Sequence, residues 1–341
     1  MNNTYCTIPQ TELTVPVIGF GTGTKWQWKK KAENPISDEN PSNTDPELVD
    51  SLVLAIRSGF THLDTAEFYT TRPDVGEAIQ KAIDDPTTPI KSRDELFVAD
   101  KYNGRLDKYL PNGEIRGPYN SMKECLRLMK LDYIDLFLIH EQYEPEWMSL
   151  EQMWKEMVQL KNEGLVKTIG VSNYTVELLE RVKATGLEAP QVLQIEFHPY
   201  LQDQSPGIRE YCQKNGILLE AYGPLVPLTK ARNAWDELIE QGQKPEGSEP
   251  PLEPVLRELS AKYGKSETQI LLKYAHKHQF ITITTSSKAE RMKDILSVFE
   301  WELSDEDVQK IDAAGNSWFY RAFDIPPLPN YNEELKTLRG L

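Results

Sequence analysis

Four polar side chains of this 341-residue chain stand at or just after the ends of predicted strands, and their chemistry is complementary. Asp64 and Tyr69 follow one strand, Lys101 follows the next, and His140 ends the one after it. A tyrosine with a pKa of roughly 10 is a poor acid at neutral pH, but a nearby ammonium lowers that pKa. A buried lysine in turn needs a carboxylate, such as Asp64, to stay charged. A neutral imidazole at His140 can orient a carbonyl oxygen, so we expect a site in which Tyr69 donates a proton.

Each of these residues also has an ordinary structural explanation. An aspartate at a strand end often only caps a helix, and a lysine after a strand usually lies at the surface. A lone histidine at an apolar strand end is more often a satisfied core group. The coincidence of all four at one rim, in complementary roles, favours the chemical interpretation.

The elements that must position these residues alternate between strand and helix. Short apolar runs predict eight strands, at residues 15–23, 61–64, 96–99, 133–139, 168–171, 192–197, 217–221 and 281–284. Helical spacing predicts helices that run from Pro46 towards Gly59 and near 74–83, 120–129, 149–163, 176–184, 206–214, 267–278 and 289–298. Strands this apolar are covered on both faces, and eight units favour a closed (β/α)8 barrel of the α/β class over an open doubly wound sheet. In such barrels the catalytic groups sit at the carboxyl ends of the strands.

Several segments fall outside this alternation. Residues 25–45 are polar and predict a loop, and residues 225–250 predict a functional loop or a disordered insertion. Two extra helices are predicted near 252–263 and 304–314, followed by a tail rich in proline and aromatic residues. Because no linker divides the chain, we expect one domain that spans residues 1–341.

Composition narrows the class of partner. The net charge of −15 disfavours nucleic acid and anionic membrane surfaces as partners, and no apolar run reaches the roughly 20 residues of a membrane span. The first residues lack the basic and apolar parts of a signal peptide, and three scattered cysteines indicate neither disulfides nor a metal site. We therefore expect a cytoplasmic monomer or weak dimer, without a metal, that acts on a small molecule.

The chain resembles the aldo-keto reductases from about residue 8 to residue 315. The segments that carry the resemblance are G-F-G-T at 19–22, D-T-A-E-F-Y at 64–69, A-D-K-Y at 99–102 and L-I-H at 138–140. The resemblance implies an NADPH-dependent reduction of a ketone or aldehyde. It also implies catalytic roles for Asp64, Tyr69, Lys101 and His140.

Further matches to that family imply a nicotinamide site and a phosphate site. Ser172, Asn173 and Gln194 would hydrogen-bond the carboxamide, and Tyr222 would stack on the nicotinamide in a segment that continues to Gly223 and Leu225. The segment after the eighth strand would hold the 2′-phosphate through Thr285, Ser286, Ser287, Lys288 and Arg291. Two positions depart from the family, since Thr285 stands where many relatives carry lysine and Ile295 where an asparagine contacts adenine. Ordinary barrel packing is the alternative explanation for Gln194 and Tyr222.

A narrower resemblance concerns the substrate. Residues 21–26, 194–208 and 284–288 are most similar to the fungal conjugated polyketone and α-keto amide reductases. That similarity implies α-dicarbonyl compounds, α-keto amides or esters, or ketolactones as substrates. Aromatic residues that we expect to line the substrate pocket, or else to anchor loops, are Trp26, Trp28, Tyr143, Trp147 and Trp318. A carboxylate at Glu141 would repel an acidic substrate unless it points to solvent.

Two other functions remain open at this point. An NADPH-holding sensor or regulatory subunit with little turnover, like the potassium-channel β subunits, would retain the same four residues. A barrel isomerase would not need the carboxamide set. The sequence contains neither the dinucleotide motif G-x-G-x-x-G nor a phosphate loop. His140-Glu141 begins like a zinc motif but lacks its second histidine.

Overall fold

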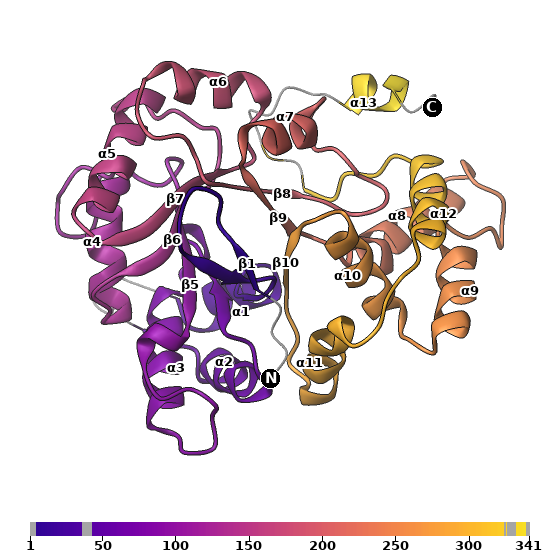
Figure 1. Cartoon of the computed structure of the whole chain (residues 1–341), viewed down its shortest axis with the longest axis horizontal. Coiled ribbons are helices and arrows are strands. Elements are labelled where there is room, and N and C mark those ends of the chain that lie inside the picture. The colour runs from indigo at the N-terminus through magenta and orange to yellow at the C-terminus, as the bar shows by residue number, and fades with distance from the viewer. Residues whose placement is uncertain (1–4, 36–42, 324, 326–331, 339–341) are drawn as a thin grey trace.

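A closed barrel of parallel strands forms the centre of the protein, in a computed structural model that describes residues 5–35, 43–323, 325 and 332–338. The strand order is β10-β3-β4-β5-β6-β7-β8-β9, with every neighbouring pair parallel (Figure 1). The strands are β3 (Ile18–Gly21), β4 (His62–Asp64), β5 (Phe97–Tyr102), β6 (Ile134–Ile139), β7 (Val166–Ser172), β8 (Val192–Glu196), β9 (Leu218–Tyr222) and β10 (Ile281–Thr284). The predicted (β/α)8 barrel is confirmed.

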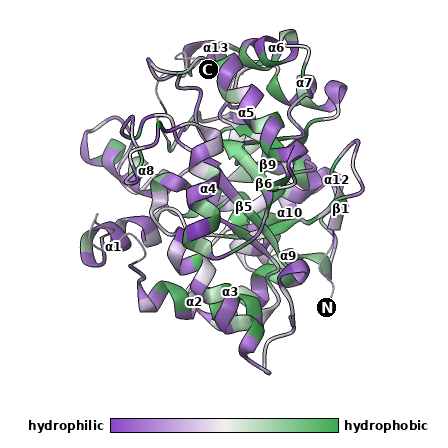
Figure 2. Cartoon of the chain, turned by 90° about the vertical axis from the view of Figure 1, so that its left-hand side faces the viewer, coloured by the Kyte–Doolittle hydropathy of each residue, from purple (hydrophilic) through white to green (hydrophobic). Residues whose placement is uncertain are grey.

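Eight helices surround the barrel close to the predicted positions. They are α2 (Pro46–Ser58), α3 (Arg72–Asp84), α4 (Pro118–Met129), α5 (Leu150–Asn162), α6 (Val176–Ala184), α7 (Ile208–Asn215), α10 (Glu267–Lys277) and α11 (Ala289–Leu296). Local sequence explains where α2 begins and ends: Asp45 accepts the backbone N–H groups of Glu47 and Leu48, and Gly59 ends the helix at φ 113°. Figure 2 shows hydrophobic colour on strands such as β5 and β6 and hydrophilic stretches on the helices around them.

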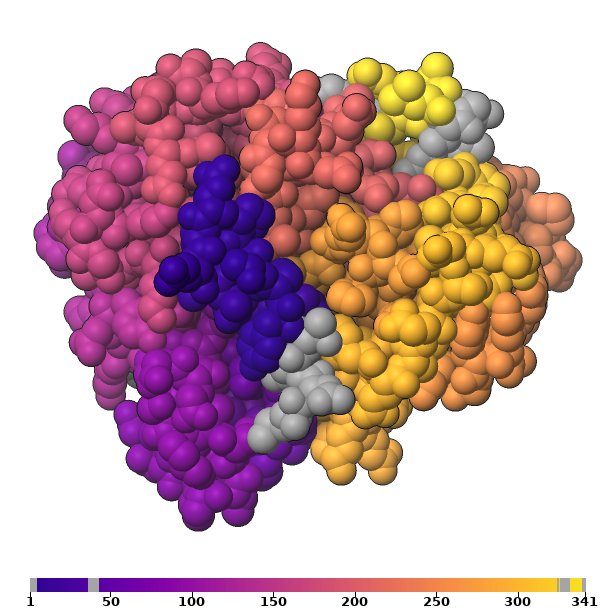
Figure 3. Space-filling view, in the orientation of Figure 1, coloured from indigo at the N-terminus to yellow at the C-terminus, as the bar shows by residue number. Residues whose placement is uncertain are grey.

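The amino end of the barrel is closed by a hairpin. The predicted strand at 15–23 is in fact two strands, because β2 (Thr14–Pro16) pairs antiparallel with β1 (Tyr5–Thr7) before β3 begins. Ile8 and Val15 of this hairpin pack on Phe97, Val192 and Ile281, the first residues of three barrel strands. Figure 3 shows the hairpin, in indigo, lying across this face of the molecule. Polar chemistry is therefore left to the opposite, carboxyl end.

The prediction of a loop over residues 25–45 is wrong in its first part. Residues Lys25–Glu33 form helix α1, which buries Trp26 and Lys30. The Lys30 ammonium lies 2.6 Å from Asp74 of α3, and both side chains are fully buried. A tertiary ion pair therefore stabilises a helix whose own sequence is charged and has little apolar periodicity. Residues 36–42 of the predicted loop lie outside the described residues.

The sequence also predicted too few extra helices. The expected α9 (Glu253–Tyr263) and α12 (Asp305–Asn316) are present, but the described residues also contain α1, α8 (Lys230–Glu240) and α13 (Asn332–Leu338). Helix α8 lies within the predicted insertion and is anchored by Trp235, whose ring centroid is 4.9 Å from that of Trp318. Short 3-10 turns complete the description at Glu67–Tyr69 (η1), Arg93–Glu95 (η2), Val226–Leu228 (η3) and Ser297–Phe299 (η4). In the tail, residues 324 and 326–331 lie outside the described part. Of the helices that the structure describes, none has both the length and the apolarity of a membrane span.

Barrel closure near the site depends on a glycine in β7. A Cβ atom built on Gly170 would lie 2.3 Å from the carbonyl oxygen of Val192 and 2.8 Å from Cδ2 of Leu138. We expect Gly170→Ala to lower the free energy of unfolding by about 1–3 kcal/mol or more, because β7 and β8 must separate, and Gly170→Ser to lower it further. Urea denaturation measures both changes. Wild-type stability in the two variants would contradict this account of the β7–β8 contact.

Candidate active site

The structure brings Asp64, Tyr69, Lys101 and His140 together at the carboxyl end of the barrel. Lys101 projects from β5 so that Nζ lies 2.7 Å from each carboxylate oxygen of Asp64 and 2.9 Å from the carbonyl oxygen of Thr65. The same Nζ is 5.2 Å from the centre of the Tyr69 ring. The His140 ring meets the Tyr69 ring edge to face, with centroids 5.5 Å apart. Four residues from three consecutive strand ends therefore share one cluster.

The electrostatics of the cluster keep the phenol protonated. Burial raises the pKa of Tyr69 above its ordinary value, the Lys101 charge opposes that shift, and the Asp64 charge adds to it. The sequence predicted that the lysine would lower this pKa, so the direction of its effect is as expected but burial outweighs it. Burial alone would lower the pKa of Lys101, but the Asp64 carboxylate raises it above the ordinary value. Burial and the Lys101 charge hold the pKa of His140 well below its usual range, so its imidazole is neutral.

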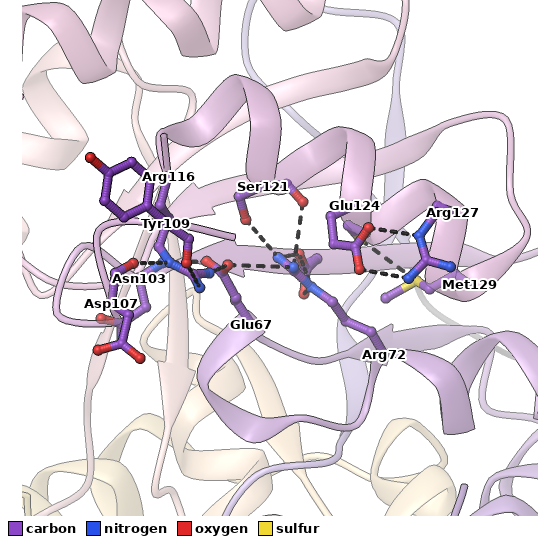
Figure 4. Close-up of polar contacts among 12 residues, drawn as sticks. Glu67, Arg72, Asn103, Asp107, Tyr109, Arg116, Ser121, Glu124, Arg127 and Met129 are labelled. Atoms are coloured by element: carbon purple, nitrogen blue, oxygen red, sulfur yellow. Dashed lines mark hydrogen bonds and ion pairs between the residues drawn. The ribbon is translucent and has the colours of Figure 1, made fainter. Parts of the chain in front are cut away.

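The short turn η1, which carries Tyr69, is anchored by a buried cluster of charges. Figure 4 shows this cluster around Glu67 and Arg72. Glu67, in the same turn, pairs with Arg116, lies 3.8 Å from Arg72 and accepts the backbone N–H of Asn103 at 3.1 Å. Arg72 donates to Asp100 of β5, with the shortest contact 2.6 Å from Nη2 to Oδ2. The cluster thus fastens the turn to the strand that carries Lys101.

Gly23 lets the backbone approach Tyr69 closely. A Cβ atom at Gly23 would lie 3.0 Å from Cζ of Tyr69 and 3.3 Å from its hydroxyl oxygen. Any larger residue would press on the phenol itself. The last of the alternating glycines, Gly23, therefore has a steric role beside the proposed acid.

The predicted carboxamide set lies beside the cluster, but its polar atoms are engaged within the chain. The Asn173 amide donates to the carbonyl oxygen of His140 and to Ser172, and its oxygen accepts from Tyr222 and Gln204. Gln194 is turned into the barrel, where it donates to Asp64 at 3.0 Å. To hold a carboxamide, Asn173 must exchange one of these hydrogen bonds. Gly223 and Leu225 follow Tyr222, with Gly223 at φ 70°.

The segment after β10 contains backbone N–H groups that no side chain caps. Helix α11 starts after Lys288 with no side chain that caps its amides, and Ser287, Lys288 and Arg291 are exposed. Ser286 accepts the backbone N–H of Lys288 at 3.2 Å. Uncapped amides beside two cations fit a phosphate group, which is the ligand predicted for this segment. Thr285 instead accepts from the indole N–H of Trp26 at 3.1 Å.

The structure does not gather the five candidate pocket aromatics on one wall. Trp26 is buried against Thr285, whereas Trp28 is 59% exposed on α1. Trp318 packs on Tyr200 and Trp235 as an anchor of the tail. Tyr143 and Trp147 follow β6, where the Arg105 guanidinium lies 4.7 Å from the Tyr143 ring and the Trp147 indole donates to the carbonyl oxygen of Arg116.

Sequence reasoning missed three groups at this end of the barrel. Arg105 forms an ion pair with Glu141, so the charge next to His140 is compensated. Glu196 accepts the backbone N–H groups of Ala322 and Phe323 and thereby ties the tail to β8. The Phe323 ring meets that of Tyr222 at 5.3 Å. The contacts of the tail span more than a hundred positions and those of Arg105 span 36, so neither leaves a local sequence signal.

After Arg105 and the Glu196 contact with the tail, the third missed group is Glu220, which had a visible signal in the sequence. Glu220 is a lone carboxylate in the apolar strand L-L-E-A-Y, and it is fully buried inside the barrel. Within the described residues, no cluster of three His, Cys, Asp or Glu side chains could hold a metal ion.

Comparison with known proteins bears on all of these features. The sequence model of the aldo/keto reductase family matches residues 17–316. An NADPH-dependent alpha-keto amide reductase of Saccharomyces cerevisiae is 39% identical over 306 residues, which cover 88% of each chain. An NAD/NADP-dependent indole-3-acetaldehyde reductase of Schizosaccharomyces pombe is 33% identical and covers 91% of this chain and 95% of its own.

A similar fold occurs in a solved structure. The crystal structure of a Bombyx mori aldo-keto reductase in complex with NADP matches with a TM-score of 0.73 and 26% identity. The match covers 97% of this chain and 98% of the other.

The buried cluster behind Tyr69 yields a matched pair of substitutions. Arg72→Met removes the partner of the buried Asp100, and we expect it to lower the free energy of unfolding by about 3–5 kcal/mol, because a buried charge is left without a partner. Arg127→Met breaks the exposed pair with Glu124 and should cost less than about 1 kcal/mol. Urea denaturation compares the two. Equal effects would show that the Arg72 pair does not stabilise this part of the fold.

Proposed function

The chain belongs to the aldo/keto reductase family and is an oxidoreductase that reduces carbonyl groups with NAD(P)H, and we propose that its cofactor is NADPH and its substrates are small α-dicarbonyl compounds. This class includes α-keto amides, α-keto esters and ketolactones, which the enzyme reduces to alcohols within a single domain of residues 1–341. The observation that carries the proposal is the buried Lys101–Asp64 pair beside the protonated Tyr69.

The four clustered residues divide the work of reduction between them. NADPH, when bound, supplies the hydride that reaches the carbonyl carbon. Tyr69 donates its phenolic proton to the carbonyl oxygen as negative charge develops there. His140 holds that oxygen with the single N–H group of its neutral ring. The proton and the orientation thus come from two adjacent rings.

The lysine and the aspartate act on Tyr69 rather than on the substrate. A general acid must be protonated before the reaction, and burial keeps the Tyr69 phenol in that state. As the proton leaves, the Lys101 ammonium stabilises the phenolate, so its charge lowers the barrier more than it affects the resting enzyme. Asp64 keeps Lys101 charged in a site that excludes water.

The preference for NADPH rests on the phosphate-binding segment. The uncapped amides of α11 lie beside Arg291 and Lys288, whose charges compensate for the threonine at position 285. Ser286 and Ser287 add hydroxyl groups. A guanidinium donates to two phosphate oxygens at once, which makes Arg291 the group most specific for a 2′-phosphate.

The substrate class rests on a relative and on the rim of the site. The yeast relative is described as an α-keto amide reductase. At the rim, the Glu141–Arg105 pair carries no net charge, so it offers no unpaired cation that would favour an acidic substrate over an uncharged dicarbonyl. Tyr143 beside Arg105 and Phe323 beside Tyr222 would provide aromatic surface for it.

The proposed acid can be tested directly. Tyr69→Phe removes the only proposed proton donor and keeps the ring, so kcat with an isatin-like diketone should fall by at least about 10²–10⁴-fold while NADPH still binds. Consumption of NADPH absorbance measures the rate. Tyr102→Phe is the control, because the Tyr102 hydroxyl is buried and has no hydrogen-bond partner in the described part of the chain. Substantial turnover by Tyr69→Phe would refute the mechanism, whereas NADPH binding by wild type with no turnover would favour a sensor.

Cofactor selection gives a second test. Arg291→Ala should weaken NADPH binding by about ten- to a hundredfold and leave NADH nearly unchanged, because only NADPH carries the phosphate. Fluorescence titration with each cofactor measures the dissociation constants. Lys293→Ala serves as control, because Lys293 is an exposed cation two residues further along the same helix. Equal losses for the two cofactors would mean that Arg291 does not read the 2′-phosphate.

A further inference from the structure

A line of buried polar groups continues from Asp64 into the interior of the barrel. The Gln194 amide donates to Asp64 Oδ2 at 3.0 Å and to Glu220 Oε2 at 2.6 Å. Gln194 and Glu220 stand opposite each other in the β8–β9 register. One side-chain amide therefore bridges the carboxylate that holds Lys101 and a second carboxyl group that the proposed mechanism does not use.

The far oxygen of Glu220 faces a histidine nitrogen at a distance too long for a hydrogen bond. Glu220 Oε1 lies 3.6 Å from His62 Nε2, and within the described residues neither atom makes a hydrogen bond. His62 Nδ1 lies 3.2 Å from the carbonyl oxygen of Pro16, which can only accept. Nδ1 therefore carries the proton of the neutral ring, and Nε2 presents a lone pair to Glu220. Two buried acceptors that face each other require one proton between them.

The environment decides which group holds that proton. Burial and the Asp64 charge raise the pKa of Glu220 to about 8. Burial lowers the pKa of His62 to about 4. At neutral pH the carboxyl group of Glu220 is therefore the group that holds the proton, and the imidazole of His62 is neutral.

We propose that Glu220 is a positioning residue that must be protonated: its O–H points to His62, and through Gln194 it leaves Asp64 as the one ionised carboxylate next to Lys101. The inference rests on the proposed role of Tyr69 as acid. When Glu220 ionises, a second negative charge acts on Lys101 and on the phenolate that forms at Tyr69. Negative charge near a phenolate disfavours it, so Tyr69 becomes a weaker acid.

The groups that face Glu220 come from several elements. They are His62 and Asp64 of β4, Lys101 of β5, Gln194 of β8 and the Cys6 thiol of β1, while β10 places the apolar Ile281 opposite it. Asp135 of β6 acts on His62. Lys101 is the cation in this set, and the Asp64 carboxylate already pairs with it.

The first test is the pH dependence of turnover. Glu220→Gln imitates the protonated acid, because its amide can donate to His62 and its oxygen can accept from Gln194. We expect wild-type kcat to fall roughly fivefold between pH 8 and pH 9 as Glu220 ionises, and the variant to lack this fall. Glu156→Gln is the control, since Glu156 is a carboxyl group with a pKa raised by burial that lies outside the barrel and accepts the backbone N–H of Tyr119. An alkaline fall that persists in Glu220→Gln overturns the proposal.

The second test does not depend on activity. Because the folded pKa of Glu220 is raised from 4.5 to about 8, its stabilising contribution is complete below 4.5 and is lost as pH rises towards 8. His62 acts in the opposite sense, with stability lost as pH falls from 6.5 towards 4. Between pH 6.5 and 8 the Tm of the wild type should therefore fall relative to that of Glu220→Gln. The Tm of Glu156→Gln should fall in parallel with that of the wild type. A constant difference in Tm between wild type and Glu220→Gln over this range overturns the proposal.

Infrared spectroscopy of the wild type covers the case in which Glu220→Gln does not fold. A protonated carboxyl band at pH 7 that disappears by pH 9, in wild type and in Glu156→Gln alike, supports the proposal, and its absence at pH 7 overturns it. If the proton is found but no carbonyl compound is reduced, the assignment of the proton stands and the proposed function fails.

Discussion

A lysine ammonium without access to water needs a carboxylate in contact, and the Lys101–Asp64 pair meets that condition. The pair joins two neighbouring strands whose register is fixed by the hydrogen bonds of a closed barrel. Closure leaves no edge at which β4 and β5 could slip, so the 2.7 Å contacts between Nζ and the carboxylate are set by the architecture. Gln194 and Thr65 use the remaining hydrogen-bonding capacity of the pair, and no charge in it is left unsatisfied.

Paired buried charges also lie behind Tyr69. The turn η1 is only three residues long, and a turn of that length does not hold a ring in place by itself. Glu67 supplies the anchor, since its carboxylate is buried between two guanidinium groups. Two buried ion clusters, one under Lys101 and one under Tyr69, therefore meet at the proposed acid. Buried charges are costly to fold, but once paired they admit few alternative arrangements.

Regular periodicity made the barrel predictable, and long-range contacts made the rest unpredictable. Apolar runs and capping residues such as Asp45 placed the strands and the eight outer helices within a few residues. Helix α1 was not predictable, because the contact that stabilises it is between Lys30 and Asp74, 44 positions apart. The four clustered residues were predictable because each stands at or just after the end of a strand. The direction of the Gln194 side chain was not predictable. Either face of a strand can carry a polar group when the interior of the barrel provides a partner such as Glu220.

The hairpin at the amino end of the barrel links the two faces of the protein. Barrel enzymes are commonly described as modular, with one end responsible for stability and the other for chemistry. Here the carbonyl oxygen of Pro16 at the closed end selects the tautomer of His62, and His62 faces Glu220 on the line that leads to Asp64. The hairpin formed by the first strands thus helps to determine which group near the site holds a proton. Recombination that exchanged this hairpin for one of different backbone path would change the acid–base chemistry at the opposite rim without altering a single residue there.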